Sequence, residues 1–337
     1  MTSRIRPSDP AGVRAWLTDL GLAPVGDVTL SPLGAGQSNL TFRVHDRTGH
    51  QWVLRMPPAG PHLDSAHDVL REARIMSALG PTPVPVPHVH GTLEDPPAFL
   101  MSCVEGVVLD SRAALDATPH EVRRTIGLSL VRTLGAVHAV DLDATGLSTL
   151  ASHAPYAERQ LRRWTRQWEA SRTRDLPTLD ALTERLRAAV PPQRETTLVH
   201  GDGHVLNVVT APGTGEVVAL LDWELSTLGE PLADLGTLLA YWPQAGEPAM
   251  QHLAPSQHPG FATRDDLVEA YATATGRDVD GVGFWHVLGL WKVAIIAEGI
   301  LHRAQAEPAP AAQHEFPRER IDVLVEHAHQ VATDAGF

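Results

Sequence analysis

The stretch LVHGDGHVLNVVTAPGTGEVVALL at residues 198–221, followed directly by Asp222, carries the strongest chemical signal in the sequence. Asp202 and Asn207 lie five residues apart on an expected loop, and Asp222 follows a short apolar run typical of a strand. Oxygen atoms of carboxylates and carboxamides suit Mg²⁺, which usually keeps water and substrate phosphate as its other ligands. A remaining carboxylate can receive the proton of an attacking hydroxyl group. The stretch therefore predicts a magnesium–nucleotide site that supports phosphoryl transfer.

The same stretch allows two other interpretations. His200, Asp202 and His204 could bind a transition metal, since imidazole and carboxylate groups both suit one. The two histidines do not form an HExxH pattern, however, and no third set of ligands is apparent. The loop could also be a network of purely structural hydrogen bonds. Motifs nearer the N-terminus favour phosphoryl transfer over both alternatives.

A glycine-rich segment, LGAGQSN at residues 33–39, lies between two expected strands. Gly34 and Gly36 let the backbone approach a ligand closely, and Ser38 adds a hydroxyl donor for phosphate oxygens. The segment is not a Walker A motif, because no Gly-Lys-Ser/Thr follows it. Glycine-rich hairpin turns are common, so this segment gives only weak support to a nucleotide site.

The strand after this segment carries a cation. In WVLRM, Arg55 lies on the strand face opposite Trp52, and a nucleotide phosphate could be its partner. Glu72, in the helix expected over residues 65–79, is the obvious carboxylate to hold it. The pair could equally be a surface salt bridge worth only about 0–1 kcal/mol. The only lysine, Lys292, lies far along the chain, so Arg55 is the cation available to this region.

The spacing of apolar residues changes near residue 105. Residues 40–45 alternate apolar and polar side chains and residues 51–56 continue the hairpin, whereas beyond residue 107 apolar residues recur at helical spacing. This pattern predicts an α+β protein. We expect a β-rich nucleotide-binding domain over residues 1–104 and a helical domain over residues 105–337, which holds the catalytic loop and the substrate site.

Composition excludes several classes of protein. The formal net charge of −13 argues against nucleic acid or an anionic membrane as a partner, since both select basic surfaces. One cysteine, Cys103, excludes an internal disulfide framework and fits a reducing compartment. The N-terminus has no apolar segment of the kind found in signal peptides. We therefore expect a soluble, cytoplasmic protein.

Several of these motifs together resemble a known family. HGDGHVLN and LLDWELSTLGEPLADL, after LGAGQSN and REARIM, resemble the aminoglycoside phosphotransferase and choline-kinase-like family. More narrowly, YAERQLRRWTRQWEAS, LDWELSTLGEPLADLGTLLAYW and WKVAIIAEGILHRA resemble the branch found fused to, or beside, acyl-CoA dehydrogenases. The similarity runs from about residue 33 to about residue 304. It implies a protein-kinase-like fold of two lobes, with a five-stranded first lobe and a mainly helical second lobe.

The resemblance also implies roles for individual residues of the second half. Asp202 would be the catalytic base, and Asn207 and Asp222 would hold Mg²⁺. Asp234, in GEPLADL, resembles a buried carboxylate that braces the catalytic loop.

In the first half the implied roles concern the nucleotide. Arg55 would stand where the family often has lysine, paired with Glu72, and this departure leaves room for a weak or inactive kinase. The backbone of residues 101–104 would receive adenine. The nucleotide-binding residues implied in this way are Gly34, Gly36, Ser38, Arg55, Glu72, Met101 and Cys103.

The implied activity is transfer of a phosphoryl group to the hydroxyl of a small molecule, with ATP or another nucleoside triphosphate and Mg²⁺ as cofactors. The narrower resemblance favours a hydroxyacyl-CoA or a lipid-like alcohol as the acceptor. Two alternatives remain open: an aminoglycoside-type antibiotic phosphotransferase, and a regulator that binds nucleotide without catalysis. The sequence is silent on the oligomeric state.

Overall fold

The computed structural model describes residues 9–33, 39–58, 68–249, 254–306 and 318–337. Two compact units can be distinguished in it. The first comprises Met1–Gly106 and a later segment, Val218–Glu224. The second comprises Val107–Val217 and Leu225–Phe337. The segment that contains Asp222 thus belongs to the first unit, although the residues on both sides of it belong to the second.

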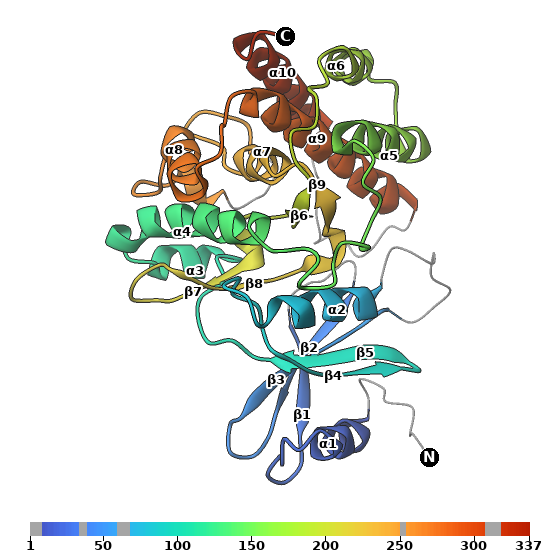
Figure 1. The fold of residues 1–337 in the computed structure, drawn as a ribbon, viewed down its shortest axis with the longest axis vertical. Coiled ribbons are helices and arrows are strands. Elements are labelled where there is room, and N and C mark those ends of the chain that lie inside the picture. Colours follow the sequence, from blue (N-terminus) through green and yellow to red (C-terminus); the bar gives the residue numbers. More distant parts are fainter. Residues whose placement is uncertain (1–8, 34–38, 59–67, 250–253, 307–317) are drawn as a thin grey trace. The chain divides into compact units, whose positions relative to one another are not determined.

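The described part of the first unit is built on a five-stranded antiparallel sheet, as predicted (Figure 1). The strand order is β1-β2-β3-β5-β4. Within the sheet Arg55 is paired with Thr41 on one side and with Phe99 on the other, which places it on a central strand. The strands are β1 (Thr29–Pro32), β2 (Leu40–His45), β3 (Gln51–Met56), β4 (Val89–Glu94) and β5 (Pro97–Ser102).

Two helices accompany this sheet. Helix α1 (Pro10–Asp19) begins after Asp9, whose side chain accepts a hydrogen bond from the Gly12 N–H at 3.0 Å. Its buried side packs in one cluster with the sheet residues Trp52 and Leu54. Helix α2 (Val69–Leu79) packs against β4 and β5 and carries Glu72 on its buried side. The sheet and α2 therefore position Arg55 and Glu72.

The second unit is mainly helical, which confirms the α+β class. Strand β6 pairs with β9 in an antiparallel ladder, and the loop after β6 contains Asp202. The helices are α3 (Arg112–Ala117), α4 (His120–His138), α5 (Tyr156–Ser171), α6 (Pro177–Ala188), α7 (Leu232–Ala240), α8 (Arg264–Thr275), α9 (Val282–Ala306) and α10 (Arg318–Asp334). The short elements are β6 (Thr197–Val199), η1 (Val205–Asn207), β7 (Val208–Thr210), β8 (Val217–Leu220), η2 (Trp223–Leu225), β9 (Thr227–Gly229) and η3 (Pro255–Gln257). Of these, β8 and η2 extend across the boundaries between the two units.

Helix α9 forms the centre of this unit. Among the described residues it is the one helix long and apolar enough, by composition, to cross a membrane, and 83% of that apolar window is buried inside the protein. This burial is typical of the core helix of a globular domain. Four tryptophans of this unit are buried in its core: Trp168, Trp242, Trp285 and Trp291.

Helices α7 and α9 touch at two glycines. A Cβ atom on Gly236 would overlap the backbone carbonyl of Trp285. One on Gly289 would lie 2.8 Å from the carbonyl oxygen of Gly236. Neither obstacle is a flexible side chain, so the helices must separate to accept either atom. These glycines set the distance between the helices that carry Asp234 and Lys292.

We expect Gly236→Ala to lower the free energy of unfolding by about 1–3 kcal/mol, because the new methyl group overpacks the contact between the two helices. Alanine otherwise favours a helix over glycine, so the direction of the change is diagnostic. Chemical denaturation measures it. Gly213→Ala is the matched control, since its Cβ would meet nothing within 4 Å. Equal stability of the two variants would contradict close helix packing at Gly236.

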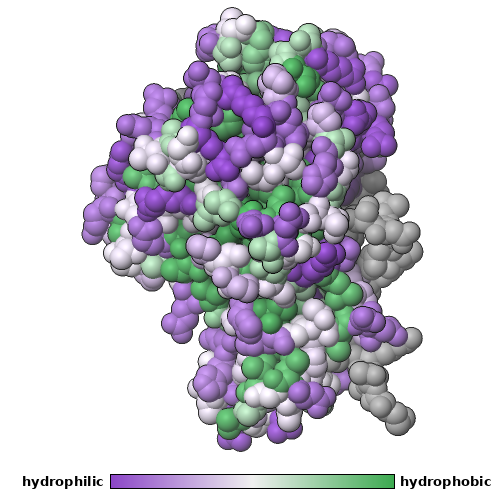
Figure 2. All heavy atoms as spheres, in the orientation of Figure 1, coloured by the Kyte–Doolittle hydropathy of each residue, from purple (hydrophilic) through white to green (hydrophobic). Residues whose placement is uncertain are grey.

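The surface combines hydrophilic and hydrophobic side chains. Figure 2 shows hydrophilic side chains spread over the visible face, with smaller hydrophobic areas between them. Among the described residues the exposed large hydrophobic side chains are Val25, Val218 and Val323. Such isolated side chains are ordinary on a protein surface.

Candidate active site

The loop after β6 is held by a buried carboxylate. The N–H groups of His200 and Gly201 donate hydrogen bonds to Asp234, to Oδ2 at 2.6 Å and to Oδ1 at 2.8 Å. Gly201 has φ of +82°, and a Cβ there would lie 2.7 Å from the backbone oxygen of Leu225. Only glycine fits both conditions. In the HGD motif, the positive φ of Gly201 and the hydrogen bonds to Asp234 together fix the backbone before Asp202.

The Asp234 carboxylate is in turn held by His138. His138 Nε2 lies 3.1 Å from Asp234 Oδ2, and His138 Nδ1 lies 2.7 Å from the hydroxyl of Tyr271. Burial by itself would raise the pKa of Asp234, but its hydrogen bonds and the neighbouring histidines outweigh burial and lower it. Asp234 therefore stays ionised as a fixed acceptor for the loop.

Asp202, the expected catalytic base, lies at the turn of this loop. Asn207 Nδ2 donates to the Asp202 backbone oxygen at 2.9 Å and to Oδ2 at 3.0 Å. His204 Nε2 lies 3.4 Å from the same Oδ2, and the Asp202 side chain is 23% exposed. Burial would raise the pKa of Asp202, but His204, Lys292 and His200 together hold it well below its ordinary value. The carboxylate is therefore ionised and can accept a hydrogen bond.

The alternative of a transition-metal site finds no support in the described part of the chain. No group of three or more His, Cys, Asp or Glu side chains is placed there to hold a metal ion. His200 is completely buried, and its Nδ1 accepts a hydrogen bond from the Asp202 N–H at 3.3 Å. His204 caps the η1 turn by accepting from the Leu206 N–H. Both histidines shape the loop.

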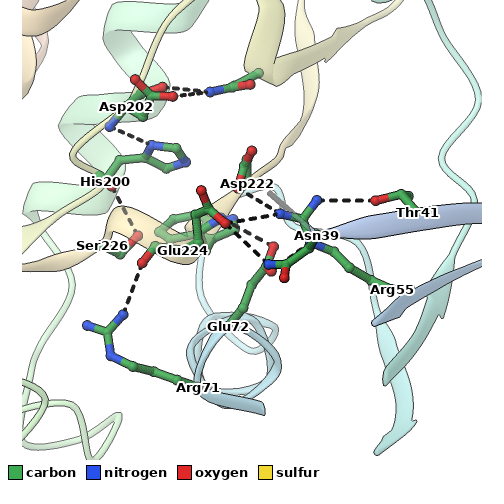
Figure 3. Close-up of polar contacts among 12 residues, drawn as sticks. Asn39, Thr41, Arg55, Arg71, Glu72, His200, Asp202, Asp222, Glu224 and Ser226 are labelled. Atoms are coloured by element: carbon green, nitrogen blue, oxygen red, sulfur yellow. Dashed lines mark hydrogen bonds and ion pairs between the residues drawn. The ribbon is translucent and has the colours of Figure 1, made fainter. Parts of the chain in front are cut away.

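A second polar cluster lies in the first unit, around Arg55 (Figure 3). The Arg55 Nε atom is 2.8 Å from Glu72 Oε2, and Nη2 is 2.8 Å from Asp222 Oδ1. Nη2 also lies 3.8 Å from Glu224 Oε2. The Arg55 side chain is 12% exposed and that of Glu72 is 2% exposed. One guanidinium group thus serves three carboxylates.

The charge balance of this cluster is uneven. Burial raises the pKa of Glu72 to about 7. The negative charges of Asp222 and Glu224 add to this rise, and Arg55 opposes it. For Arg55, burial would lower the pKa, but the three carboxylates outweigh it and raise the value. The cluster carries more negative than positive charge, as expected for a site that receives a cation.

Asp222 also has an unusual backbone. Its φ is +63°, and among the described residues it shares a positive φ outside glycine only with Ala23. Such a conformation costs of order 1–3 kcal/mol and is often found at functional sites. Asp222 lies two residues after the end of β8, at the position that the sequence motif marks.

The structure describes only some of the remaining predicted site residues. Gly34, Gly36 and Ser38 lie outside the described residues. Met101 is buried in β5, opposite Val53. Cys103 is half-buried after β5, and burial raises the pKa of its thiol.

Sequence reasoning missed three residues that the structure brings to these clusters. Glu224 follows Asp222 by two positions in the LDWE segment, and that proximity was an available signal. His204 was considered only as a metal ligand, yet it contacts the Asp202 carboxylate. Lys292 was noted only as a lone lysine, and its Nζ donates to the Gly201 oxygen at 2.7 Å.

Comparisons with known proteins identify the family of the chain. Residues 29–280 match the model of the phosphotransferase enzyme family. The chain is 34% identical to acyl-CoA dehydrogenase family member 10 of Mus musculus and 31% identical to family member 11 of Gallus gallus. These alignments include 94% and 93% of the chain. The chain spans only 30% and 42% of the length of those two relatives.

Solved structures show the same fold. A Ralstonia eutropha protein provisionally named an aminoglycoside phosphotransferase superposes with a TM-score of 0.76 at 28% identity, over 96% of this chain and 97% of that one. The aminoglycoside phosphotransferase APH(4)-Ia, solved in a ternary complex with AMP-PNP and hygromycin B, gives a TM-score of 0.60 at 15% identity. That alignment includes 96% of this chain and 98% of the other. The fold is that of the kinase-like phosphotransferases, and the chain belongs to the phosphotransferase enzyme family.

Proposed function

We propose that the protein transfers the γ-phosphoryl group of ATP, or of another nucleoside triphosphate, to a hydroxyl group of a small molecule with the help of Mg²⁺. The observation that carries this proposal is the Asp202 loop. An ionised carboxylate is held there between Asn207 and His204, on a backbone fixed by Asp234. This arrangement suits a group that orients an attacking hydroxyl and receives its proton.

The residues expected to hold Mg²⁺ have suitable atoms free. The Asn207 amide donates through Nδ2, and its Oδ1 has no hydrogen-bond partner in the described part of the protein. Asp222 accepts from Arg55 through Oδ1, and among the described residues its Oδ2 has no partner. A carboxamide and a carboxylate oxygen match the ligand preference of Mg²⁺. When bound, Mg²⁺ would neutralise the charge of the phosphate oxygens.

The nucleotide would be held by the first unit. In our proposal Arg55, oriented by Glu72, contacts the phosphates as a planar guanidinium group. Outside regular strand pairing, no backbone hydrogen bond of the described residues involves Cys103 or Val104 just after β5. The backbone N–H and C=O groups of Cys103 and Val104 would be available to adenine, and a contact of adenine with Met101 stays a prediction. Gly34, Gly36 and Ser38 stay a prediction for the phosphate loop. The AMP-PNP complex of APH(4)-Ia supports nucleotide binding by this fold.

In the transfer step, Asp202 would accept a hydrogen bond from the acceptor hydroxyl and take its proton as the bond from the hydroxyl oxygen to the γ-phosphorus forms. The bond from the γ-phosphorus to the bridging oxygen breaks at the same time, and the nucleoside diphosphate leaves with that oxygen. Asn207 would keep the carboxylate in one rotamer through Nδ2. Arg55 would stabilise negative charge on the phosphate oxygens. The contribution of these residues is positioning and charge stabilisation, which dominate phosphoryl transfer in general.

For the acceptor we propose a hydroxyacyl-CoA or another lipid-like alcohol. The support is the 30–34% identity with proteins named acyl-CoA dehydrogenase family members 10 and 11. An aminoglycoside is the alternative, because the Ralstonia eutropha neighbour is named for that substrate class. We further propose a cytoplasmic location without nucleic-acid or membrane partners, and nucleotide binding by residues 1–104.

The test is Mg²⁺-dependent ADP formation across a panel of hydroxyacyl-CoAs, lipid-like alcohols and aminoglycosides. We expect stimulation by a member of the first two classes and loss of activity when EDTA removes Mg²⁺. Stimulation by aminoglycosides alone would replace the acceptor class. Tight binding of Mg²⁺–AMP-PNP without turnover on any acceptor would favour a nucleotide-binding regulator.

A further inference from the structure

The only lysine of the chain is buried beside the proposed catalytic loop. Lys292 lies in the middle of α9 with 9% of its surface exposed. Its Nζ donates a hydrogen bond of 2.7 Å to the carbonyl oxygen of Gly201, which is 91 residues away in sequence. The indole ring of Trp164, from α5, lies 5.5 Å from Nζ. Burying an ammonium group costs free energy unless hydrogen bonds or opposite charges compensate it. The position of Lys292 therefore suggests that its charge has a role.

Gly201 is clamped on both sides. Asp234 accepts a hydrogen bond from its N–H, and Lys292 donates one to its carbonyl oxygen. The two peptide planes that meet at Gly201 are therefore fixed by opposite charges. The plane that Lys292 fixes is the one that leads into Asp202.

The surroundings of Lys292 leave little competition for this bond. The cavity beside it, lined also by Trp164, Thr237 and Gly289, has a volume of about 10 Å³. A space of that size holds at most one water molecule. Among the described residues, Nζ has no other hydrogen-bond acceptor than Gly201. Burial lowers the pKa of Lys292, and Asp202 and Asp234 oppose this by favouring the charged form.

We propose that Lys292 is a positioning residue of the phosphotransferase, which fixes the carbonyl of Gly201 so that Asp202 is held in one orientation toward the acceptor. This inference rests on the catalytic role proposed for Asp202. It assigns the sole lysine to the catalytic loop of the second unit, whereas Arg55 serves the first.

Lys292→Met tests the proposal, because methionine has a similar length without the charge. Hydrogen exchange of the amides of residues 200–207 should become about tenfold faster, since the loop loses one of its two clamps. Mg²⁺-dependent ATP hydrolysis with water as the acceptor should fall about tenfold in kcat, while the affinity for Mg²⁺–AMP-PNP stays unchanged. Global stability should hold or rise, because apolar replacement of a buried ion is often favourable.

Two further variants complete the experiment. Lys292→Arg keeps the cation and should restore part of kcat and of the exchange protection. Arg264→Met is the matched control, since Arg264 also donates to a backbone oxygen, that of Trp242, in the same unit. It should leave exchange of the loop and kcat unchanged. Unaltered loop exchange in Lys292→Met overturns the inference. Faster exchange in a protein without any turnover keeps the clamp and rejects the proposed function instead.

Discussion

Replacing Asp202 by asparagine should lower the rate of phosphoryl transfer by about a hundredfold to ten-thousandfold, the range typical for loss of a general base. The carboxamide keeps the size of the carboxylate and can still accept a hydrogen bond from Asn207 Nδ2. It cannot take the proton of the attacking hydroxyl. The fold should survive, because the bonds from His200 and Gly201 to Asp234 do not involve the Asp202 side chain.

The measurement is kcat with the acceptor that the panel identifies, alongside the affinity for Mg²⁺–AMP-PNP. We expect kcat to fall and the nucleotide affinity to stay within about twofold, since the loss concerns the transferred proton. Asp116→Asn is the control, because Asp116 forms an exposed ion pair with Arg112 on α3 and contacts no part of the loop. An Asp202→Asn protein that turns over at the wild-type rate removes Asp202 from the role of base.

Much of this architecture could be predicted from local patterns in the sequence. The alternation over residues 40–45 and the continued hairpin over residues 51–56 predicted β2 and β3 at their observed bounds. The recurrence of apolar residues at helical spacing beyond residue 107 predicted the mainly helical second unit. These elements depend on side-chain spacing within one segment, which is visible in a sequence.

Contacts between distant segments could not be predicted in the same way. The anchor of Asp234 is His138, which is 96 residues away, and the partner of Gly201 is Lys292. Neither residue lies in a motif that signals its partner, and both are placed by the packing of whole helices. Pairing of Arg55 with Glu72 was predicted, but only the structure adds Asp222 and Glu224 to the same guanidinium group. Sequence motifs indicate which functional groups a site uses, whereas tertiary packing determines which of these groups contact one another.

Arg55→Met should be the most destabilising change at this cluster, with a loss of about 3 kcal/mol in the free energy of unfolding. Without Arg55, the buried Glu72 carboxyl group is left either as an uncompensated charge or, since its pKa is already raised to about 7, as a protonated group without its partner. Glu72 is 2% exposed and loses its cation entirely, whereas Asp222 and Glu224 are 33% and 21% exposed and keep more access to water. Most of the loss should therefore come from Glu72.

A double variant tests that assignment by chemical denaturation. Adding Glu72→Gln to Arg55→Met removes the buried charge and should recover most of the lost stability, which a double-mutant cycle would report as strong coupling. Arg112→Met is the matched control, since the Arg112–Asp116 pair is 68% and 58% exposed and should contribute less than about 1 kcal/mol. No recovery in the double variant would mean that Arg55 stabilises the unit by packing rather than by pairing.

The same variants decide whether arginine can serve the phosphates in place of lysine. A charged hydrogen bond is worth about 1.5–3 kcal/mol, so folded Arg55→Met should bind Mg²⁺–AMP-PNP about tenfold more weakly or worse. Arg55→Lys restores a cation, but a compact ammonium cannot reach Glu72 and Asp222 through two separate nitrogens as Nε and Nη2 do. We expect it to be intermediate in both stability and affinity. If Arg55→Met binds the nucleotide as tightly as the wild type, Arg55 only neutralises its three carboxylates. The first unit would then have to hold the phosphates without it, as a weak kinase or a nucleotide-binding regulator would.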